Sequence, residues 1–331
     1  MTVTCILPTR DRAALVGDAI ASALAQTHPV EIVVVDDGSC DATPAVLDRF
    51  GTAIRRLRTA GEGVAAARNA ALAVARGTFV AFLDSDDVWG AEKTARQLAI
   101  MTARPEVAFT FGDYTVSDPD GAGGFRVRAT RRFAGDPSLA RLLESNFIGT
   151  LTVMARRDVL RAAGGFATAL ARGSDYDLWL RVRRHHPIAR VPAVLADYRW
   201  HRGSLTGASR RRNTQNYVDV IERLATEDPD LFVEVAAALA ALLGGGATAH
   251  GRDAMSLSVV VPCRDDAAVV GCVRSVDSVA EVVVVLNGSP SEFVAWVEGA
   301  DGARACCGSI GPTAPAPRRR ASAPPPTTGC C

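Results

Sequence analysis

The chain has 331 residues, of which 48% are apolar, and its formal net charge is +1. This composition suffices for a buried core and excludes a strong charge-based preference for nucleic acid or for an anionic membrane surface. The amino terminus lacks the basic stretch that opens a signal peptide, and no apolar run has the length needed to span a bilayer. We therefore expect a cytoplasmic protein, with peripheral contact at the inner face of the membrane as the alternative.

The first 112 residues alternate between short apolar runs and alanine-rich segments of helical periodicity. The runs predict strands at 3–7, 32–35, 53–58 and 79–83. The alanine-rich segments predict helices at 13–26, 42–50, 64–75 and 91–103. Apolar runs without polar alternation are typical of parallel strands that are buried on both faces, and the arginine-rich third run favours an edge position. We therefore expect an open parallel sheet with helices on both faces.

The pattern changes after Pro105. Two further strands are expected, at 107–116 and 188–198, and a turn rich in Gly and Asp follows the first of them. The expected helices lie at 139–145, 157–163, 175–184, 210–226 and 229–243. Three glycines at 244–246 then predict a flexible linker over 244–255.

The chain contains a partial internal repeat. The stretch "ILPTRDRAALVGDAI" aligns with the later "VVPCRDDAAVVGCVR", and "VVVDDGS" at 33–39 aligns with "VVVLNGS" at 283–289. The repeat covers only the first strand–helix–strand unit, so residues 256–298 predict a truncated second copy. Asn287 replaces Asp37 in that copy, which favours a non-catalytic role for it. Residues 299–331 are rich in Pro, Arg and Ala and predict a disordered tail.

Polar side chains follow three of the expected strands at their carboxyl ends. The three clusters are Pro8-Thr9-Arg10-Asp11, Asp36-Asp37-Gly38-Ser39 and Asp84-Ser85-Asp86-Asp87. Ligands of parallel α/β sheets bind at the carboxyl ends of strands, so we expect the clusters to converge on one edge of the sheet. Taken singly, each acidic cluster is equally compatible with a turn or a helix cap.

Three carboxylates lie within four positions, at Asp84, Asp86 and Asp87, and their repulsion favours a bound cation. Mg²⁺ and Mn²⁺ prefer oxygen ligands and usually take one or two carboxylates together with phosphate oxygens. The two-residue period of an extended chain would place Asp84 and Asp86 on the same side. We expect these two residues at a metal site and Asp87 in the turn that precedes the next helix.

Several sequence blocks, taken together, resemble the inverting nucleotide-sugar glycosyltransferases of family 2, which have the GT-A fold. Between residues 2 and 205 the blocks read "ILPTRDR", "VVVDDGSCDAT", "GVAAARNAALAVARG", "FVAFLDSDDVW", "GSDYDLWLR" and "YRWHRGSLT". The resemblance implies a GT-A-like α/β domain over 1–205, in which helices flank a Rossmann-type mixed sheet. Its nucleotide-binding half would be 1–112 and its acceptor half 113–205, before a helical segment at 206–243.

The resemblance also implies a donor site at the first two clusters. Thr9 and Asp37 would lie against the nucleotide base, with Asp37 accepting a hydrogen bond from a ring N–H. Pro8 and Arg10 flank Thr9 in the same motif, and Arg68 would face the nucleotide pocket. Uracil and thymine present the same ring N–H, so the implied donor is a UDP-sugar or dTDP-sugar.

The implied metal site uses the third cluster. Asp86 would lie nearer the metal and the diphosphate, and Asp84 nearer the sugar and the ribose, with Ser85 between them. His201 occupies the position at which related enzymes place a residue near the metal or the diphosphate. The implied cofactor is Mg²⁺ or Mn²⁺.

Asp175 matches the general base of the family. A carboxylate within hydrogen-bond reach can take the proton of an acceptor hydroxyl as it attacks the sugar, while a cation on the opposite side stabilises the leaving nucleoside diphosphate. The family often has Glu before the base, whereas this chain has Ser174, and Asp177 is a competing position. The acceptor would be a carbohydrate, a lipid-linked sugar or a protein, in polysaccharide, glycolipid or glycoprotein assembly.

Two other functions remain open from the sequence. The stretch from Gly61 to Ala66, "GEGVAA", fits a dinucleotide-binding fingerprint with Asp84 about 20 residues further on, which would indicate an NAD-dependent oxidoreductase. That interpretation leaves Asp36 and Asp37 unexplained. The second alternative is a non-catalytic module that binds a sugar nucleotide.

Overall fold

The computed structural model of the chain describes residues 1–144, 146–170, 172–201, 220 and 223–224, together with four strands between residues 259 and 310. The chain divides into two compact units, Met1–Leu239 and Ala240–Cys331. Positions 220, 223 and 224 are helical, as expected for 210–226. The rest of that segment, the expected helix at 229–243 and the expected linker at 244–255 lie outside the described residues.

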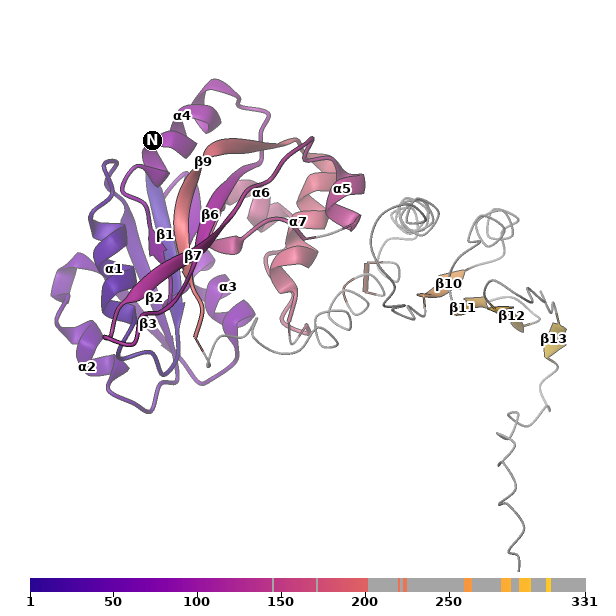
Figure 1. The fold of residues 1–331 in the computed structure, drawn as a ribbon, viewed down its shortest axis with the longest axis horizontal. Helices are drawn as coiled ribbons and strands as arrows, with labels where there is room; N and C mark the ends of the chain where they lie inside the picture. Colours follow the sequence, from indigo (N-terminus) through magenta and orange to yellow (C-terminus); the bar gives the residue numbers. More distant parts are fainter. Residues whose placement is uncertain are drawn as a thin grey trace, which may run out of the picture. The chain divides into compact units, whose positions relative to one another are not determined.

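A nine-stranded mixed sheet forms the centre of the first unit (Figure 1). Eight strands follow the order β3-β2-β1-β4-β8-β6-β9-β5, and β7 pairs with β6 beside this path. The strands are β1 (Val3–Thr9), β2 (Glu31–Asp37), β3 (Arg55–Thr59), β4 (Phe79–Phe82), β5 (Val88–Trp89), β6 (Phe109–Pro119), β7 (Phe125–Arg131), β8 (Met154–Arg156) and β9 (Ile188–Arg199).

Four strands, β3-β2-β1-β4, form the parallel half of the sheet, and β3 lies at its edge. The helices of the unit lie between the strands in sequence. They are α1 (Val16–Leu24), α2 (Thr43–Asp48), α3 (Val64–Val74), α4 (Lys93–Ala103), α5 (Leu139–Glu144), α6 (Arg157–Ala162) and α7 (Ser174–His185). The predicted parallel pairing and the predicted edge position of the third strand are both confirmed.

Each face of the sheet carries its own apolar core because alternate residues of a strand point to opposite faces. In β1, Ile6 belongs to one core, whereas Cys5 and Leu7 belong to the other. The first core includes Ala71 of α3 and Trp179 of α7. The second core includes Ile20 of α1, Leu47 of α2 and Met101 of α4. Helices therefore cover both faces, as the continuous apolar runs predict.

The second half of the sheet is not purely parallel. Strand β6 runs parallel to β9, whereas β8 is antiparallel to both β4 and β6, and β7 and β5 pair antiparallel with β6 and β9. The parallel sheet expected from the apolar runs of the first 112 residues is thus confirmed for β1 to β4, and the mixed sheet implied by the family resemblance is correct for the sheet as a whole. The turn expected after residue 116 connects β6 to β7 in an antiparallel hairpin.

The second unit contains the strands β10 (Val259–Cys263), β11 (Glu281–Leu286), β12 (Glu292–Glu298) and β13 (Gly308–Ile310). Strands β10 and β11 are parallel, and Pro262 pairs with Val285 in the same register in which Pro8 pairs with Val35. This is the register that the repeat alignment implies. Strand β12 is antiparallel to β11, unlike β3 beside β2. Strand β13 lies within residues 299–331, for which we expected a disordered tail.

Candidate active site

The ends of β1, β2 and β4 converge, as the sequence predicts for the three polar clusters. Asp11, which follows β1, accepts a hydrogen bond from the backbone N–H of Cys40 after β2, with 2.8 Å between Oδ1 and N. Arg12 reaches from the same loop to Asp86 after β4, and its Nε lies 3.4 Å from Oδ2. These contacts tie the three loops into one surface at the carboxyl edge of the parallel half of the sheet.

The acidic cluster forms a turn rather than a continuation of the strand. Strand β4 ends at Phe82, and the backbone N–H of Asp87 donates to the carbonyl of Asp84 at 3.1 Å. The two-residue period of an extended chain therefore does not apply, and our reason for placing Asp84 and Asp86 on one side is wrong. Instead, each aspartate has its own partners, and Ser85 is buried within the turn.

Asp84 forms an ion pair with Arg68 of α3. The Nη2 of Arg68 donates to Oδ1 of Asp84 at 2.6 Å, and the Arg68 side chain is buried. Burial raises the pKa of Asp84, the charge of Arg68 opposes this, and the charges of Asp86 and Asp175 add to the rise. The charge of Asp175 acts on Asp84, so Asp175 lies near the acidic turn.

Asp86 is contacted by two side chains that carry or can carry positive charge. Its Oδ2 lies 3.0 Å from Nε2 of His201 and 3.4 Å from Nε of Arg12. For His201, the family resemblance implied a position near the metal or the diphosphate. It did not single out Arg12, although the residue lies within the quoted motif "ILPTRDR".

Asp87 is buried and accepts a hydrogen bond from the backbone N–H of Arg199, with 2.9 Å between Oδ1 and N. Burial raises the pKa of Asp87 well above its usual value, and the charges of Asp86 and Asp84 raise it further. The carboxyl group therefore connects the acidic turn to the end of β9. This differs from the expected role in the turn before α4.

Asp37 holds the loop that follows β3. It accepts hydrogen bonds from Oγ1 of Thr59 at 2.6 Å and from the backbone N–H groups of Glu62 and Gly63 at 2.9 and 2.8 Å. Burial alone would raise the pKa of Asp37, but the hydrogen bonds from Thr59, Gly63 and Glu62 outweigh it and bring the pKa below its usual value. Asp37 is therefore an anchored anion, which can still accept from a ligand because each carboxylate oxygen has two lone pairs.

The residues of the first cluster lie at the end of β1, which pairs with β2. Thr9 is buried, and its Oγ1 makes no hydrogen bond within the part of the chain that the structure describes. The guanidinium of Arg10 lies over the loop after β3, so close that a Cβ at Gly61 would be 3.1 Å from Nη1. Pro8 lies within β1, paired with Val35. Arg10 thus supplies positive charge near Asp37, and Thr9 lies in register with the neighbouring Asp36.

The contacts of Asp37 exclude the dinucleotide fingerprint. A dinucleotide-binding loop uses its backbone N–H groups to bind a pyrophosphate. Here the N–H groups of Glu62 and Gly63 already donate to the Asp37 carboxylate, which would repel a phosphate. The loop also follows an edge strand, β3.

Asp175 and Asp177 have different surroundings in the first turn of α7. Asp175 is half-buried, and its Oδ2 accepts a hydrogen bond from Oγ1 of Thr150 at 2.6 Å. Asp177 is fully buried, pairs with Arg181 at 2.6 Å and also contacts Arg223. Two guanidinium groups engage Asp177, so Asp175 is the better placed to exchange a proton with a ligand.

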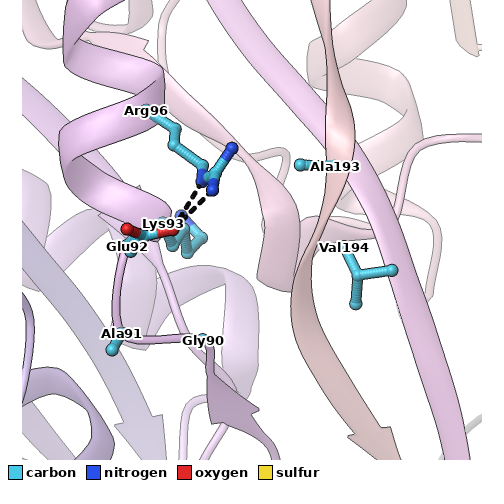
Figure 2. A pocket seen from close by; sticks show the side chains of 7 residues that line it. All are labelled: Gly90, Ala91, Glu92, Lys93, Arg96, Ala193 and Val194. Carbon is cyan, nitrogen blue, oxygen red and sulfur yellow. Dashed lines mark hydrogen bonds and ion pairs between the residues drawn. The ribbon is translucent and has the colours of Figure 1, made fainter.

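A cavity of about 470 Å³ lies elsewhere, beside the start of α4 (Figure 2). Arg96 and Glu92 form an ion pair at its wall, and Val194 of β9 lies opposite. None of the residues that the sequence predicted for the donor, metal or base sites lines it. The candidate site is therefore the open surface at the strand ends.

The carboxylates of the acidic turn suit a hard cation that binds together with a phosphate substrate. Within the described residues, no three His, Cys, Asp or Glu side chains are grouped so as to enclose a metal ion. Mg²⁺ and Mn²⁺ that bind with a phosphate substrate need only one or two protein carboxylates, which Asp86 and Asp84 can supply. The donor set fits such a cation.

Among the described helices, none combines the length and the apolar character required to cross a bilayer.

Residues 4–162 match the glycosyl transferase family 2 model. The chain is also 30% identical over 211 residues to the Escherichia coli enzyme named UDP-Glc:alpha-D-GlcNAc-diphosphoundecaprenol beta-1,3-glucosyltransferase WfgD, and this alignment covers 62% of this chain and 79% of WfgD. The chain belongs to glycosyltransferase family 2. The resemblance found in the sequence blocks is thereby confirmed, and the chain is an enzyme rather than an NAD-dependent oxidoreductase or a non-catalytic binding module.

Solved structures support the GT-A-like fold of this glycosyltransferase. S. aureus TarS 1–349 in complex with UDP-GlcNAc superposes with a TM-score of 0.58 at 19% identity, over 72% of each chain. The mannosyltransferase PcManGT from Pyrobaculum calidifontis, solved with GDP-Man and Mn²⁺, superposes with a TM-score of 0.51 at 22% identity, over 76% of each chain. At these identities the likeness concerns the fold.

Three residues of the site were not predicted from the sequence. Arg12 contacts Asp86, Thr150 contacts Asp175 and the backbone of Arg199 contacts Asp87. Each pair joins segments at least 25 residues apart. No local pattern signals such pairs, although Arg12 and Arg199 both lie within motifs that carry the family resemblance, "ILPTRDR" and "YRWHRGSLT".

Proposed function

We propose that this family 2 enzyme is a metal-dependent inverting glycosyltransferase that moves a sugar from a nucleoside-diphosphate sugar to an acceptor hydroxyl. The observation that carries the proposal is the presence of two kinds of carboxylate around Asp84, whose pKa is raised by burial and by the charges of both Asp86 and Asp175. Asp86 lies in the acidic turn beside Arg12 and His201, whereas Asp175 has a single neutral donor, Thr150, among the described residues. A cation site and a base near each other are what in-line displacement requires.

The donor is a UDP-sugar or a dTDP-sugar in this proposal. Asp37 is an anchored acceptor for the ring N–H of uracil or thymine, and the buried, unsatisfied hydroxyl of Thr9 lies in the same part of the site. Arg10 supplies positive charge near Asp37, and Arg68 supplies it near Asp84. Support comes from the relative WfgD, whose name specifies UDP-Glc, and from TarS, which was solved with UDP-GlcNAc.

The metal is Mg²⁺ or Mn²⁺, held by Asp86 with His201 and Asp84 nearby. When bound, the cation would neutralise the charge that develops on the leaving nucleoside diphosphate. Asp86 would exchange its contacts with Arg12 and His201 for the cation, which leaves Arg12 beside the diphosphate. The fold relative PcManGT was solved with Mn²⁺, which supports this assignment.

Asp175 acts as the general base. Its carboxylate would take the proton of the acceptor hydroxyl as the oxygen attacks the anomeric carbon of the sugar. The bond from that carbon to the diphosphate oxygen breaks on the opposite side, so the configuration at the carbon inverts. Asp177 cannot substitute because Arg181 and Arg223 already engage it.

The acceptor is a carbohydrate or a lipid-linked sugar in the assembly of a cell-envelope polysaccharide, and a protein acceptor is the alternative. WfgD is named for a lipid-linked acceptor, a diphosphoundecaprenol-bound sugar, which supports this choice. An enzyme that uses a cytoplasmic sugar nucleotide and a membrane-bound acceptor would work at the inner face of the membrane.

A thermal-shift panel tests the donor and the metal together. The melting temperature is measured with UDP, dTDP, GDP, UDP-sugars and NADH, each with Mn²⁺ or with EDTA. A ligand at 100 times its Kd stabilises the native state by about 2.7 kcal/mol, which is enough to detect. We expect UDP and dTDP compounds to raise the melting temperature in the presence of Mn²⁺ but not in EDTA. Equal stabilisation in EDTA would contradict the metal role, and a preference for GDP would contradict the assigned base.

A further inference from the structure

The hydroxyl of Thr150 is directed at the carboxylate of Asp175. Its Oγ1 lies 2.6 Å from Oδ2, and Thr150 is only 7% exposed. Among the described residues, this is the hydrogen bond that the Asp175 side chain receives, and it engages one of the two oxygens. The other oxygen, Oδ1, is left for a ligand.

We propose that Thr150 is a positioning residue for the glycosyl transfer, which holds Asp175 so that Oδ1 faces the acceptor hydroxyl. The inference rests on the proposed role of Asp175 as the base. A carboxylate in the first turn of a helix can rotate about its side-chain bonds, and a short hydrogen bond to one oxygen removes this freedom. Thr150 itself does not contact the reacting atoms.

The segment that carries Thr150 is held by three side chains. Residues 150–152 form a 3₁₀ turn, and the next carbonyls are bound in succession. Leu151 O accepts from Nε1 of Trp89 at 2.9 Å, Thr152 O from Nε2 of Gln97 at 2.7 Å, and Val153 O from Nζ of Lys93 at 3.4 Å. We call Trp89, Lys93 and Gln97 the clamp. All three are buried, so the position of Thr150 is determined by the core.

The clamp also reaches the acidic turn. Nε1 of Trp89 donates to the carbonyl of Phe82 at 3.2 Å, and Phe82 ends the strand that leads into Asp84. The Trp89 indole therefore contacts both β4, which leads into the acidic turn, and the segment that carries Thr150. In-line displacement needs the base and the leaving group at a fixed separation, and a misplacement of about 1 Å can cost on the order of 100-fold in rate. The contacts of Trp89 and Thr150 thus connect the acidic turn to Asp175.

The test compares Thr150→Val, which keeps the shape and removes the hydroxyl, with Thr150→Ser, which keeps the hydroxyl. We expect Thr150→Val to lower kcat by about 10-fold to 100-fold while the KM for the donor stays within about twofold of the wild type, because the donor site is untouched. Thr150→Ser should recover most of kcat.

A control separates positioning from general destabilisation. Thr4 is also a buried threonine, whose Oγ1 donates to Glu31 at 2.6 Å and accepts from the backbone N–H of Gly77 at 2.8 Å, away from the site. Thr4→Val should lose stability without a change in kcat at a temperature where the protein stays folded. If Thr150→Val folds poorly, Thr150→Ala should show the same kcat deficit in its soluble fraction.

Two kinds of failure are distinguishable. Wild-type kcat in Thr150→Val, or a loss confined to the KM for the donor, or no recovery in Thr150→Ser, overturns the positioning role alone. Substantial activity in Asp175→Asn overturns the proposed base, and the positioning role falls with it.

Discussion

Arg68 and Asp84 form an ion pair in which the guanidinium is nearly buried and the carboxylate is one-third exposed: their side chains are 7% and 33% accessible, and 2.6 Å separates Nη2 from Oδ1. Arg68 thus stabilises a charge that burial and its acidic neighbours disfavour. The pair connects α3 to the acidic turn, so it should affect both stability and donor binding.

Replacing Arg68 by Met should therefore lower the free energy of unfolding by about 2 kcal/mol, the usual range for a hydrogen bond to a charged group. It should also weaken the binding of UDP measured by calorimetry in Mn²⁺. The matched control is Arg96→Met, which removes an exposed pair with Glu92 and should cost less than about 1 kcal/mol. Equal effects of the two variants on stability and binding would contradict the role of Arg68.

Asp86→Asn should abolish the Mn²⁺-dependent binding of nucleotide, because the amide has lost the charge that holds the cation. His201→Ala should weaken this binding without abolishing it, since His201 is a neighbour of Asp86 rather than the main anion. Both are measured by calorimetric titration of UDP in Mn²⁺ and in EDTA. Nucleotide binding by Asp86→Asn that still depends on Mn²⁺ would remove Asp86 from the metal site.

Asp175 and Asp177 should respond in opposite ways to the same substitution. Asp175→Asn should lower turnover by at least about 100-fold, the lower end for a lost general base, with little change in stability. Asp177→Asn should lower the free energy of unfolding by about 3 kcal/mol, because Arg181 and Arg223 lose their buried anion. Turnover per folded molecule should be retained in Asp177→Asn. The reverse pattern would transfer the role of the base to Asp177.

The buried Lys93 should make stability depend on pH. Burial lowers the pKa of Lys93 from 10.5 to about 7, and its Nζ lies near Gln97, Val153 and the Trp89 ring. Above pH 7 the folded protein has released the Lys93 proton that the unfolded chain keeps until about pH 10.5, so the unfolded state binds more protons. The free energy of unfolding should then rise with pH from about 7, by on the order of 1 kcal/mol per pH unit.

The window for this measurement ends near pH 9 because of Cys5. Burial raises the pKa of Cys5 from 9.0 to about 12, so above pH 9 the unfolded chain loses a proton that the folded one keeps, and the two slopes oppose each other. Urea unfolding at pH 7, 8 and 9 measures the effect, and Lys93→Met should flatten the profile. An unchanged slope in that variant would assign the pH dependence to another group.

Local patterns sufficed for the parallel half of the sheet and for the place of the site. The apolar runs that became β1, β2 and β4 are long and continuous, and strands connected by helices pair in parallel, so their polar carboxyl ends had to meet. The shorter strands could not be predicted from such local patterns. Strand β8 has three residues and β5 has two, and each exists through its pairing with a distant strand.

The sequence by itself determined which residue types stand at the strand ends, and therefore the family and the chemistry of the site. Only the tertiary structure decided what each aspartate contacts. Asp84, Asp86 and Asp87 are neighbours in sequence, yet they pair with Arg68 of α3, with Arg12 and His201, and with the backbone of β9. Composition and spacing are local properties, whereas a partner such as Thr150 for Asp175 depends on how the chain brings distant segments together.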